Sequence, residues 1–339
     1  MLIKMLYRRL GKSDLKASVI GLGTAQFGNK IWGYGTKYNK KDVLKIIQTA
    51  IDCGINLFDT AEVYANGLSE TLLGQAIKEY GRDNFVIVTK VAPWNLRYKN
   101  LIKSVMGSLK RLDIDSIDLC LIHHPNPLIR LKETFKAMED LVKLGKIKYI
   151  GVSNFDHRLL VKAQQCLSFS EIVADEIECN IFSWRYQLKT ISYCRKQKIS
   201  VIGYSPLAGG ILSGKYSVWN PPKDRARAFN FYSRKSFLKK AQPLFCTLRN
   251  LAEKKHATIA QIALSFVISN PICIAIPAAL SQEEVRENAE AYRIMLTKDE
   301  LTQIMKTSVT LNPFTHFFKE YVVRKLGLIK RTIELSLQK

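Results

Sequence analysis

Short apolar runs rich in β-branched residues alternate along the chain with longer amphipathic stretches, and the alternation recurs eight times. The apolar runs predict buried strands, and the amphipathic stretches predict helices that bury one face. We expect strands at residues 17–23, 55–60, 85–90, 117–123, 149–154, 172–180, 201–206 and 272–278. The expected helices lie at residues 41–53, 69–79, 100–112, 131–144, 157–166, 187–196, within 241–255, and at 282–291. This alternation indicates a parallel sheet with crossover helices.

The number of repeats favours one architecture within the α/β class. Eight strand–helix units within residues 17–291 fit a (β/α)8 TIM barrel. The alternative, a doubly wound open sheet, should begin with a strand, a Gly-x-Gly-x-x-Gly turn and then a helix. Residues 21–28, GLGTAQFG, lack the third glycine at that spacing, and a long loop follows them. The sequence therefore predicts the barrel.

Two segments do not fit the repeat. Residues 213–240 separate the seventh predicted strand from its helix and contain eight basic residues and one acid. Loops of this length in a compact domain are usually functional or disordered. Residues 312–339 carry apolar side chains at three- and four-residue spacing, which predicts an amphipathic helix. We therefore expect a barrel over residues 1–311 and a basic amphipathic C-terminal tail over 312–339.

The composition limits the class and the location of the protein. The chain has 339 residues, of which 47% are hydrophobic, enough for a substantial core. Its longest apolar stretches, such as residues 262–268, are far shorter than the roughly 20 residues of a membrane-spanning helix. The first residues lack an apolar run with a cleavage site, so we expect a cytoplasmic protein. Seven scattered cysteines include no Cys-x-x-Cys pair, and we expect no metal site.

The net charge of +23 predicts a positive surface field that attracts phosphates, nucleic acids or anionic lipids. No nucleic-acid-binding module is recognisable, so we expect no nucleic-acid partner. Basic residues of the tail, including Lys319, Arg324 and Lys330, flank its apolar positions. Contact with a membrane surface is therefore an alternative for the tail. We favour packing of the tail against the barrel or a neighbouring subunit.

Polar residues that close apolar strands are the first candidates for catalysis, because a barrel of this type has its active site at the carboxyl ends of the strands. Asp59, Lys90 and His123 each end a predicted strand, and Tyr64 follows Asp59 by five residues. Lys90 beside Tyr64 should lower the tyrosine pKa from about 10 toward the range of a general acid. Asp59 should hold and neutralise the lysine, and His123 should orient a carbonyl oxygen. The alternative is a structural ion pair with an unrelated loop tyrosine.

The segments that contain these residues resemble the aldo-keto reductase family. They are DTAEVY with GLSE at residues 59–70, TK at 89–90 and HHP at 123–125. Further segments, IGVSNF at 150–155, GYSPL at 203–207 and residues 276–288, continue the resemblance in the family's order. The resemblance implies NAD(P)H-dependent reduction of an aldehyde or ketone to an alcohol, with Tyr64 as proton donor. His124 is the competing histidine, but the His-x-Pro spacing favours His123.

The resemblance also implies a coenzyme site. It places Ser153 and Asn154 on the nicotinamide carboxamide, Tyr204 against the nicotinamide ring, and Glu176 where the family usually has a glutamine. The remaining implied coenzyme contacts are Ser205, Leu207, Lys215, Ala278, Glu284 and Asn288. Ala278, Leu280 and Glu284 occupy positions where relatives often present Arg or Lys to the 2′-phosphate. We expect NADP, with NAD as the alternative because an acid at Glu284 disfavours a phosphate.

Aromatic residues in the loops predict the substrate pocket. Trp32 and Trp94 lie in loops after predicted strands, and we expect them, with His124, to contact an apolar carbonyl compound. Tyr34 and the region near Phe314 are further candidates. Because such loops vary freely on this scaffold, the four catalytic candidates do not name one substrate.

A second function from a different class is a nucleotide-binding sensor or regulatory subunit with little turnover. The segment NLFDTAEVYA at residues 56–65 also resembles the potassium-channel β-subunits. Slow turnover and a coenzyme retained through purification would distinguish that function from the function of an ordinary reductase.

Overall fold

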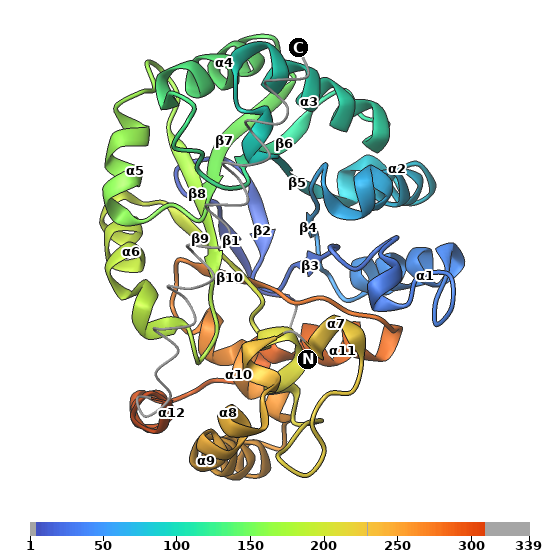
Figure 1. Ribbon diagram of the computed structural model, residues 1–339, viewed down its shortest axis with the longest axis vertical. Coiled ribbons are helices and arrows are strands. Elements are labelled where there is room, and N and C mark those ends of the chain that lie inside the picture. The colour runs from blue at the N-terminus through green and yellow to red at the C-terminus, as the bar shows by residue number, and fades with distance from the viewer. Residues whose placement is uncertain (1–4, 229, 309–339) are drawn as a thin grey trace.

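The predicted (β/α)8 barrel is confirmed by a computed structural model, which describes residues 5–228 and 230–308 (Figure 1). Each strand of an eight-stranded parallel sheet pairs with the next one along the chain. The strands are β3 (Leu22–Gly23), β4 (Leu57–Asp59), β5 (Val86–Val91), β6 (Ile117–Ile122), β7 (Ile147–Ser153), β8 (Ile172–Glu178), β9 (Ser200–Tyr204) and β10 (Cys273–Ile276). Parallel bridges from Ile20 to Ala275 and from Gly23 to Ala278 join the first strand to the last. The sheet therefore closes on itself.

Helices form the outer layer around these strands (Figure 1). They are α1 (Lys40–Asp52), α2 (Leu68–Tyr80), α3 (Tyr98–Leu112), α4 (Leu131–Lys143), α5 (His157–Gln164), α6 (Trp184–Gln197), α9 (Gln242–Lys254), α10 (Ile259–Ile268), α11 (Gln282–Glu290) and α12 (Lys298–Ser308). Alternate residues of each strand point to opposite faces, so the barrel has two cores. Leu57, Val88, Leu119 and Ile202 fill the barrel interior. The larger core lies between the strands and the helices.

The predicted strand at residues 17–23 is wrong at its start. Residues 16–18 belong to an antiparallel hairpin of β1 (Tyr7–Arg9) and β2 (Lys16–Ser18), and β3 is only two residues long. The turn of the hairpin carries Leu10, which is fully buried in the interior core. A hairpin that inserts an apolar side chain into the amino-terminal end of the barrel closes that end. The apolar run in the sequence therefore spans two elements.

Two of the outer-layer helices, α10 and α12, were not predicted, and the amphipathic pattern of α10 is weak. The run at residues 262–268 belongs to α10, in which every residue from 262 to 268 is buried. A helix covered on all sides has no polar stripe to reveal its period. Its start is fixed by a capping box, in which Thr258 accepts from the backbone of Gln261. The other missed helix is α12.

Residues 213–240 lie outside the repeat, as predicted, and contain the short helices α7 (Arg225–Ala228) and α8 (Lys235–Lys240). The tail predicted at residues 312–339 lies outside the described residues. Within the described part of the chain, no helix is both long enough and apolar enough to span a membrane.

Candidate active site

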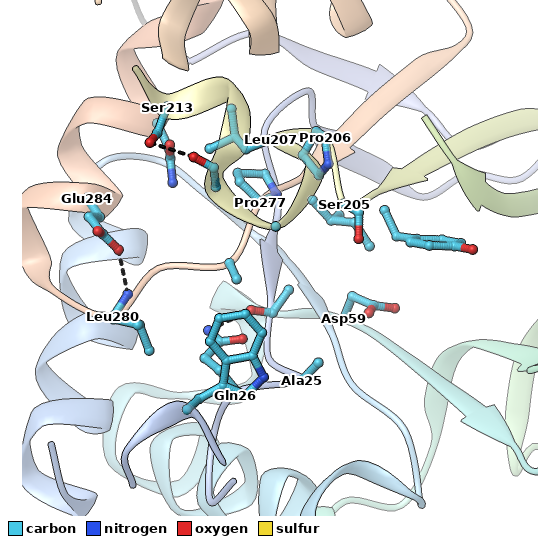
Figure 2. Close-up of a pocket in the computed structure, with 18 of the residues that line it drawn as sticks. Ala25, Gln26, Asp59, Ser205, Pro206, Leu207, Ser213, Pro277, Leu280 and Glu284 are labelled. Carbon is cyan, nitrogen blue, oxygen red and sulfur yellow. Dashed lines mark hydrogen bonds between the residues drawn. The ribbon is translucent and has the colours of Figure 1, made fainter. Parts of the chain in front are cut away.

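A cavity of about 630 Å³ opens at the carboxyl ends of the strands, where the sequence placed the chemistry. Figure 2 shows part of its wall, with Asp59 on one side and Glu284 on another. The predicted residues that line it are Trp32, Asp59, Tyr64, His123, His124, Ser153, Asn154, Glu176, Tyr204, Ser205, Leu207, Lys215, Ala278, Glu284 and Asn288. Lys90 lies beneath the surface of the cavity, and Trp94 is not among its lining residues. The fold thus brings segments that are far apart in the sequence into one site.

A buried ion pair lies at the base of the cavity. The Lys90 Nζ donates to Asp59 Oδ1 at 2.7 Å and to Oδ2 at 2.6 Å. It also donates to the Thr60 carbonyl at 2.9 Å and to the Tyr64 hydroxyl at 3.2 Å. Burial lowers the pKa of Lys90, but the charges of Asp59 and Glu176 raise it by more, so the ammonium stays protonated. The predicted association of Asp59, Lys90 and Tyr64 is therefore present.

The loop that carries Tyr64 is held against the end of β5. The Glu62 Oε1 accepts from the Ala92 backbone at 2.6 Å and from Asn95 Nδ2 at 3.1 Å. The next two residues, Ala65 and Asn66, have left-handed backbone angles, and these angles turn the chain sharply into α2. These contacts position the tyrosine hydroxyl over Lys90.

The predicted lowering of the Tyr64 pKa is wrong in direction. Burial raises the pKa of Tyr64 above its ordinary value, Lys90 lowers it by less, and the charges of Asp59 and Glu176 raise it further. The cation alone would lower the pKa, but removal of water and the second carboxyl group, Glu176, outweigh it. At neutral pH the side chain is therefore a phenol, which is the form that donates a proton.

The two histidines lie beside Tyr64. The His123 ring packs edge-on against the Tyr64 ring, with a centroid separation of 5.7 Å. His124 stacks on His123 with a centroid separation of 5.3 Å. His123 is thus the histidine in ring contact with the tyrosine, and His124 lies one layer further away.

A polar network continues from the histidines across β7 to β9. Asn154, which has a left-handed backbone φ of 62°, donates through Nδ2 to the His123 carbonyl at 3.2 Å and to Ser153 Oγ at 2.9 Å. The Tyr204 hydroxyl donates to Asn154 Oδ1 at 3.0 Å. The Ser153 hydroxyl donates to the Glu176 carbonyl at 2.9 Å. These bonds fix three predicted coenzyme contacts relative to the histidines.

Two residues that line the cavity carry a buried acceptor without a hydrogen-bond partner, namely Gln26 Oε1 and Glu176 Oε2, of which the second lies 3.3 Å from Lys90 Nζ. Such atoms are costly to bury without a donor, and they suit a polar ligand group. Gln26 was not predicted, because it lies in a loop and a loop residue gives no periodic signal of the direction in which it points. These two acceptors therefore leave room for the amide group of a nicotinamide coenzyme to donate hydrogen bonds.

The segment at residues 213–240 crosses one side of the cavity. The Lys215 Nζ donates to Glu284 Oε1 at 2.8 Å and links this segment to α11. The Glu284 Oε2 accepts from the Leu280 backbone at 2.9 Å, as Figure 2 shows. Burial raises the pKa of Glu284, but these hydrogen bonds and nearby charges lower it by more, so Glu284 is a carboxylate. The predicted acid on the adenosine side is thus already paired with a lysine.

A second contact of the same segment involves Arg227. Its guanidinium lies 4.9 Å from the Trp32 ring centroid and 5.7 Å from that of Tyr216, which the sequence analysis missed. The Arg227 Nε also donates to the Gly209 carbonyl at 2.7 Å. Gly209 and Gly210 have φ values of 69° and 93°, which favour glycine. The loop after β9 is therefore held in a tight turn beneath the arginine.

No group of three or more candidate metal ligands occurs among the residues for which the structure gives positions. Trp94 lies in the turn Pro93–Asn95 after β5. Its predicted contact with substrate remains a prediction.

Comparison with known proteins gives consistent matches. The sequence profile described as Aldo/keto reductase family matches residues 19–308. An uncharacterised oxidoreductase of Mycobacterium tuberculosis is 36% identical over 293 residues, covering 85% of this chain and 89% of the relative. A probable voltage-gated potassium channel subunit beta of Arabidopsis thaliana is 30% identical over 328 residues, covering 89% and 97%. A crystal structure from Klebsiella pneumoniae in complex with NADP and acetate has a TM-score of 0.71 at 30% identity, covering 90% and 95%.

Proposed function

Because the chain belongs to the aldo/keto reductase family, we propose that it reduces an aldehyde or ketone to an alcohol with NADPH, and with NADH as a second coenzyme. The observation that carries the proposal is the contact of the Tyr64 hydroxyl with the buried Lys90–Asp59 pair beside His123. A structural ion pair alone would not need a tyrosine hydroxyl and a histidine ring in the wall of a cavity beside it.

The cavity fits a nicotinamide coenzyme because its wall offers unpaired acceptors where an amide group could bind. Glu176, Ser153 and Asn154 would hold the carboxamide, and Tyr204 would pack against the ring. The loop after β9, with Ser205 and Leu207, would hold the pyrophosphate. The adenosine side would lie along the part of the wall formed by Lys215, Ala278, Glu284 and Asn288. The bound coenzyme supplies the hydride.

The side chains of the protein then control the position and protonation of the carbonyl group. Tyr64 donates its phenolic proton to the carbonyl oxygen as negative charge develops there. Lys90 stabilises the resulting phenolate by charge, and Asp59 holds the ammonium in place. His123 orients the same oxygen from its position in edge contact with Tyr64. Water is kept from Lys90, whose side chain is fully buried.

We propose a small apolar carbonyl compound as the substrate, since Trp32 and His124 line the cavity together with Tyr64. The similarity to a plant potassium channel β-subunit supports the alternative of a nucleotide-binding regulatory subunit. That alternative requires coenzyme binding without appreciable turnover.

The proposed function predicts that purified protein oxidises NADPH when an aldehyde is added. The test combines a fluorescence titration with NADPH and NADH and a turnover assay on a panel of aromatic and aliphatic aldehydes. Coenzyme binding with turnover supports the reductase. Binding without turnover on any aldehyde supports the regulatory subunit, and failure to bind either coenzyme contradicts both.

The Lys215–Glu284 pair should control the choice of coenzyme. Glu284→Gln removes a negative charge and frees Lys215, so we expect the ratio of Kd values for NADH and NADPH to shift toward NADPH by about tenfold. The amide oxygen can still accept from the Leu280 backbone. Lys215→Met should shift the ratio the other way. Because the Lys215 side chain is 58% exposed, both shifts should shrink with added salt. Unchanged ratios in both variants would contradict this role.

A further inference from the structure

Glu176 is a third ionisable group in the Lys90–Asp59 pair. Its Oε2 lies 3.3 Å from Lys90 Nζ, and both side chains are almost fully buried. The Lys90 ammonium has three protons, which it already shares among four acceptors, namely both Asp59 oxygens, the Thr60 carbonyl and the Tyr64 hydroxyl. Glu176 Oε2 contacts the cation at 3.3 Å, outside those four bonds, and has no well-formed hydrogen bond of its own. Strand β8 places Glu176 here, where burial, the charge of Asp59 and hydrogen bonding with Asp59 raise its pKa and the cation lowers it.

The charges of Asp59, Lys90 and Glu176 do not cancel if both carboxyl groups are ionised. Asp59, Lys90 and Glu176 would then carry a net charge of −1 at 2%, 0% and 2% exposure, respectively. An uncompensated charge in such a site is costly, and the usual outcome is uptake of a proton. Asp59 makes both short contacts with Lys90, so Glu176 is the carboxyl group left to hold that proton.

The titratable groups nearest in the fold to Glu176 come from six elements or their ends and are Asp59, Tyr64, Lys90, His123, His124, Glu178 and Tyr204. Lys90 is the only one of this set with a permanent positive charge. The two cations that line the cavity wall, Lys215 and Arg227, pair with Glu284 and Asp224. Glu178 accepts from Asn180 and from Tyr232. Burial, followed by the charge of Asp59, raises the pKa of Glu176 well above its ordinary value.

We propose that Glu176 works as a protonated carboxylic acid that takes the place of an amide toward the nicotinamide carboxamide, so that its ionisation weakens coenzyme binding. A protonated carboxyl group presents one donor and one acceptor side by side, as a glutamine amide does. It can therefore pair with both the carbonyl and the amino group of a carboxamide. The ionised group can only accept, and the carboxamide carbonyl would then face a carboxylate. This inference rests on the proposed coenzyme site.

The ionisation of Glu176 would also act on Tyr64. A negative charge on Glu176 raises the pKa of the Tyr64 hydroxyl, which makes the phenol a weaker proton donor. Loss of the Glu176 proton should therefore weaken coenzyme binding and slow the proton transfer together. With a glutamine at position 176, neither coenzyme binding nor proton transfer would depend on the ionisation of this side chain.

The protonation is tested first on the protein without coenzyme. We expect infrared spectra near neutral pH to show the carbonyl stretch of a protonated carboxyl group that is lost in Glu176→Gln. Asp175→Asn is the matched control, because Asp175 is also fully buried on β8 but points to the opposite face. Burial raises the pKa of Asp175 as well, so this variant should lose a different band and keep the Glu176 band. Identical carboxylic-acid bands in the wild type and Glu176→Gln would overturn the proposal.

A second measurement on the same samples follows stability against pH. Where the folded protein holds a proton on Glu176 and the unfolded chain does not, the free energy of unfolding falls as pH rises. That fall begins near the ordinary glutamate pKa and ends at the raised pKa of the folded state. We expect Glu176→Gln to remove this part of the pH dependence. An unaltered pH dependence in Glu176→Gln would contradict the proposal.

A third experiment measures the Kd for NADPH as a function of pH. In the wild type the Kd should rise by up to about tenfold per pH unit above the Glu176 pKa, whereas in Glu176→Gln it should stay nearly constant. The same pH dependence in both proteins would overturn the proposal while the proposed function stood. If neither protein bound a coenzyme at any pH, the proposed function would fail, and the infrared result would still decide whether Glu176 is protonated.

Discussion

Replacing Tyr64 by phenylalanine is expected to lower kcat for aldehyde reduction by about 10²–10⁴-fold, the range in which one positioned proton donor contributes. The substitution removes the hydroxyl that Lys90 contacts at 3.2 Å and leaves the ring that packs against His123. The coenzyme contacts proposed at Ser153 and Asn154 are untouched. The Kd for NADPH should therefore stay close to that of the wild type, and the loss should appear in single-turnover oxidation of bound NADPH.

Tyr149→Phe is the matched control for this experiment. The Tyr149 hydroxyl donates to Asp14 at 2.8 Å, at the closed amino-terminal end of the barrel, so its loss should leave turnover unchanged. Full turnover in Tyr64→Phe would mean that another group delivers the proton, and His123 would be the first candidate. Loss of coenzyme binding in Tyr64→Phe would instead indicate a disturbed cavity.

The sequence predicted the fold well where each element has one buried face. The helices α1 to α4 differ from the predicted ranges by at most two residues at either end, because their apolar stripes face the strands. The prediction failed for α10, which is covered on all sides, and for the hairpin β1–β2, whose apolar residues merge with those of β3 in the sequence. Hydrophobic periodicity reveals an element when one of its faces is buried and the other is exposed. It therefore does not separate neighbouring elements whose apolar residues form one continuous run.

The candidate site was predictable because a parallel barrel brings the carboxyl ends of its strands together. Asp59, Lys90 and His123 could be placed from that rule and from the strand ends alone. The sign of the Tyr64 pKa could not, because it depends on how much water is removed and on which carboxyl groups lie within reach. Gln26 and Tyr216 were also missed, since a loop residue gives no periodic signal of the direction in which it points.

The surroundings of Glu176 could not be predicted from the sequence either. The sequence places it at the carboxyl end of β8 and, by resemblance, beside the carboxamide. Its distance of 3.3 Å from Lys90 follows only from the registers of β4, β5 and β8 around the closed barrel. A single charge difference at this position therefore changes the electrostatics of Asp59, Lys90 and Tyr64 together.

Replacing Lys90 by methionine is expected to lower the free energy of unfolding by about 3–5 kcal/mol at neutral pH, the usual cost of removing one partner of a buried ion pair. Methionine fills a similar volume but leaves the Asp59 carboxylate with no cation. The loss should shrink at roughly pH 5, because carboxyl groups without a cation take up protons more readily.

The matched controls decide between an electrostatic cause and a packing cause. Lys148→Met removes a lysine whose side chain is 51% exposed and which pairs with Asp118 at 2.7 Å, so it should cost less than about 1 kcal/mol. The double variant Lys90→Met with Asp59→Asn removes the stranded charge of Asp59 and should recover much of the stability, although not the activity. Urea unfolding at both pH values measures all three variants. A loss in Lys90→Met that is independent of pH, and that Asp59→Asn does not relieve, would assign the role of Lys90 to packing rather than to charge.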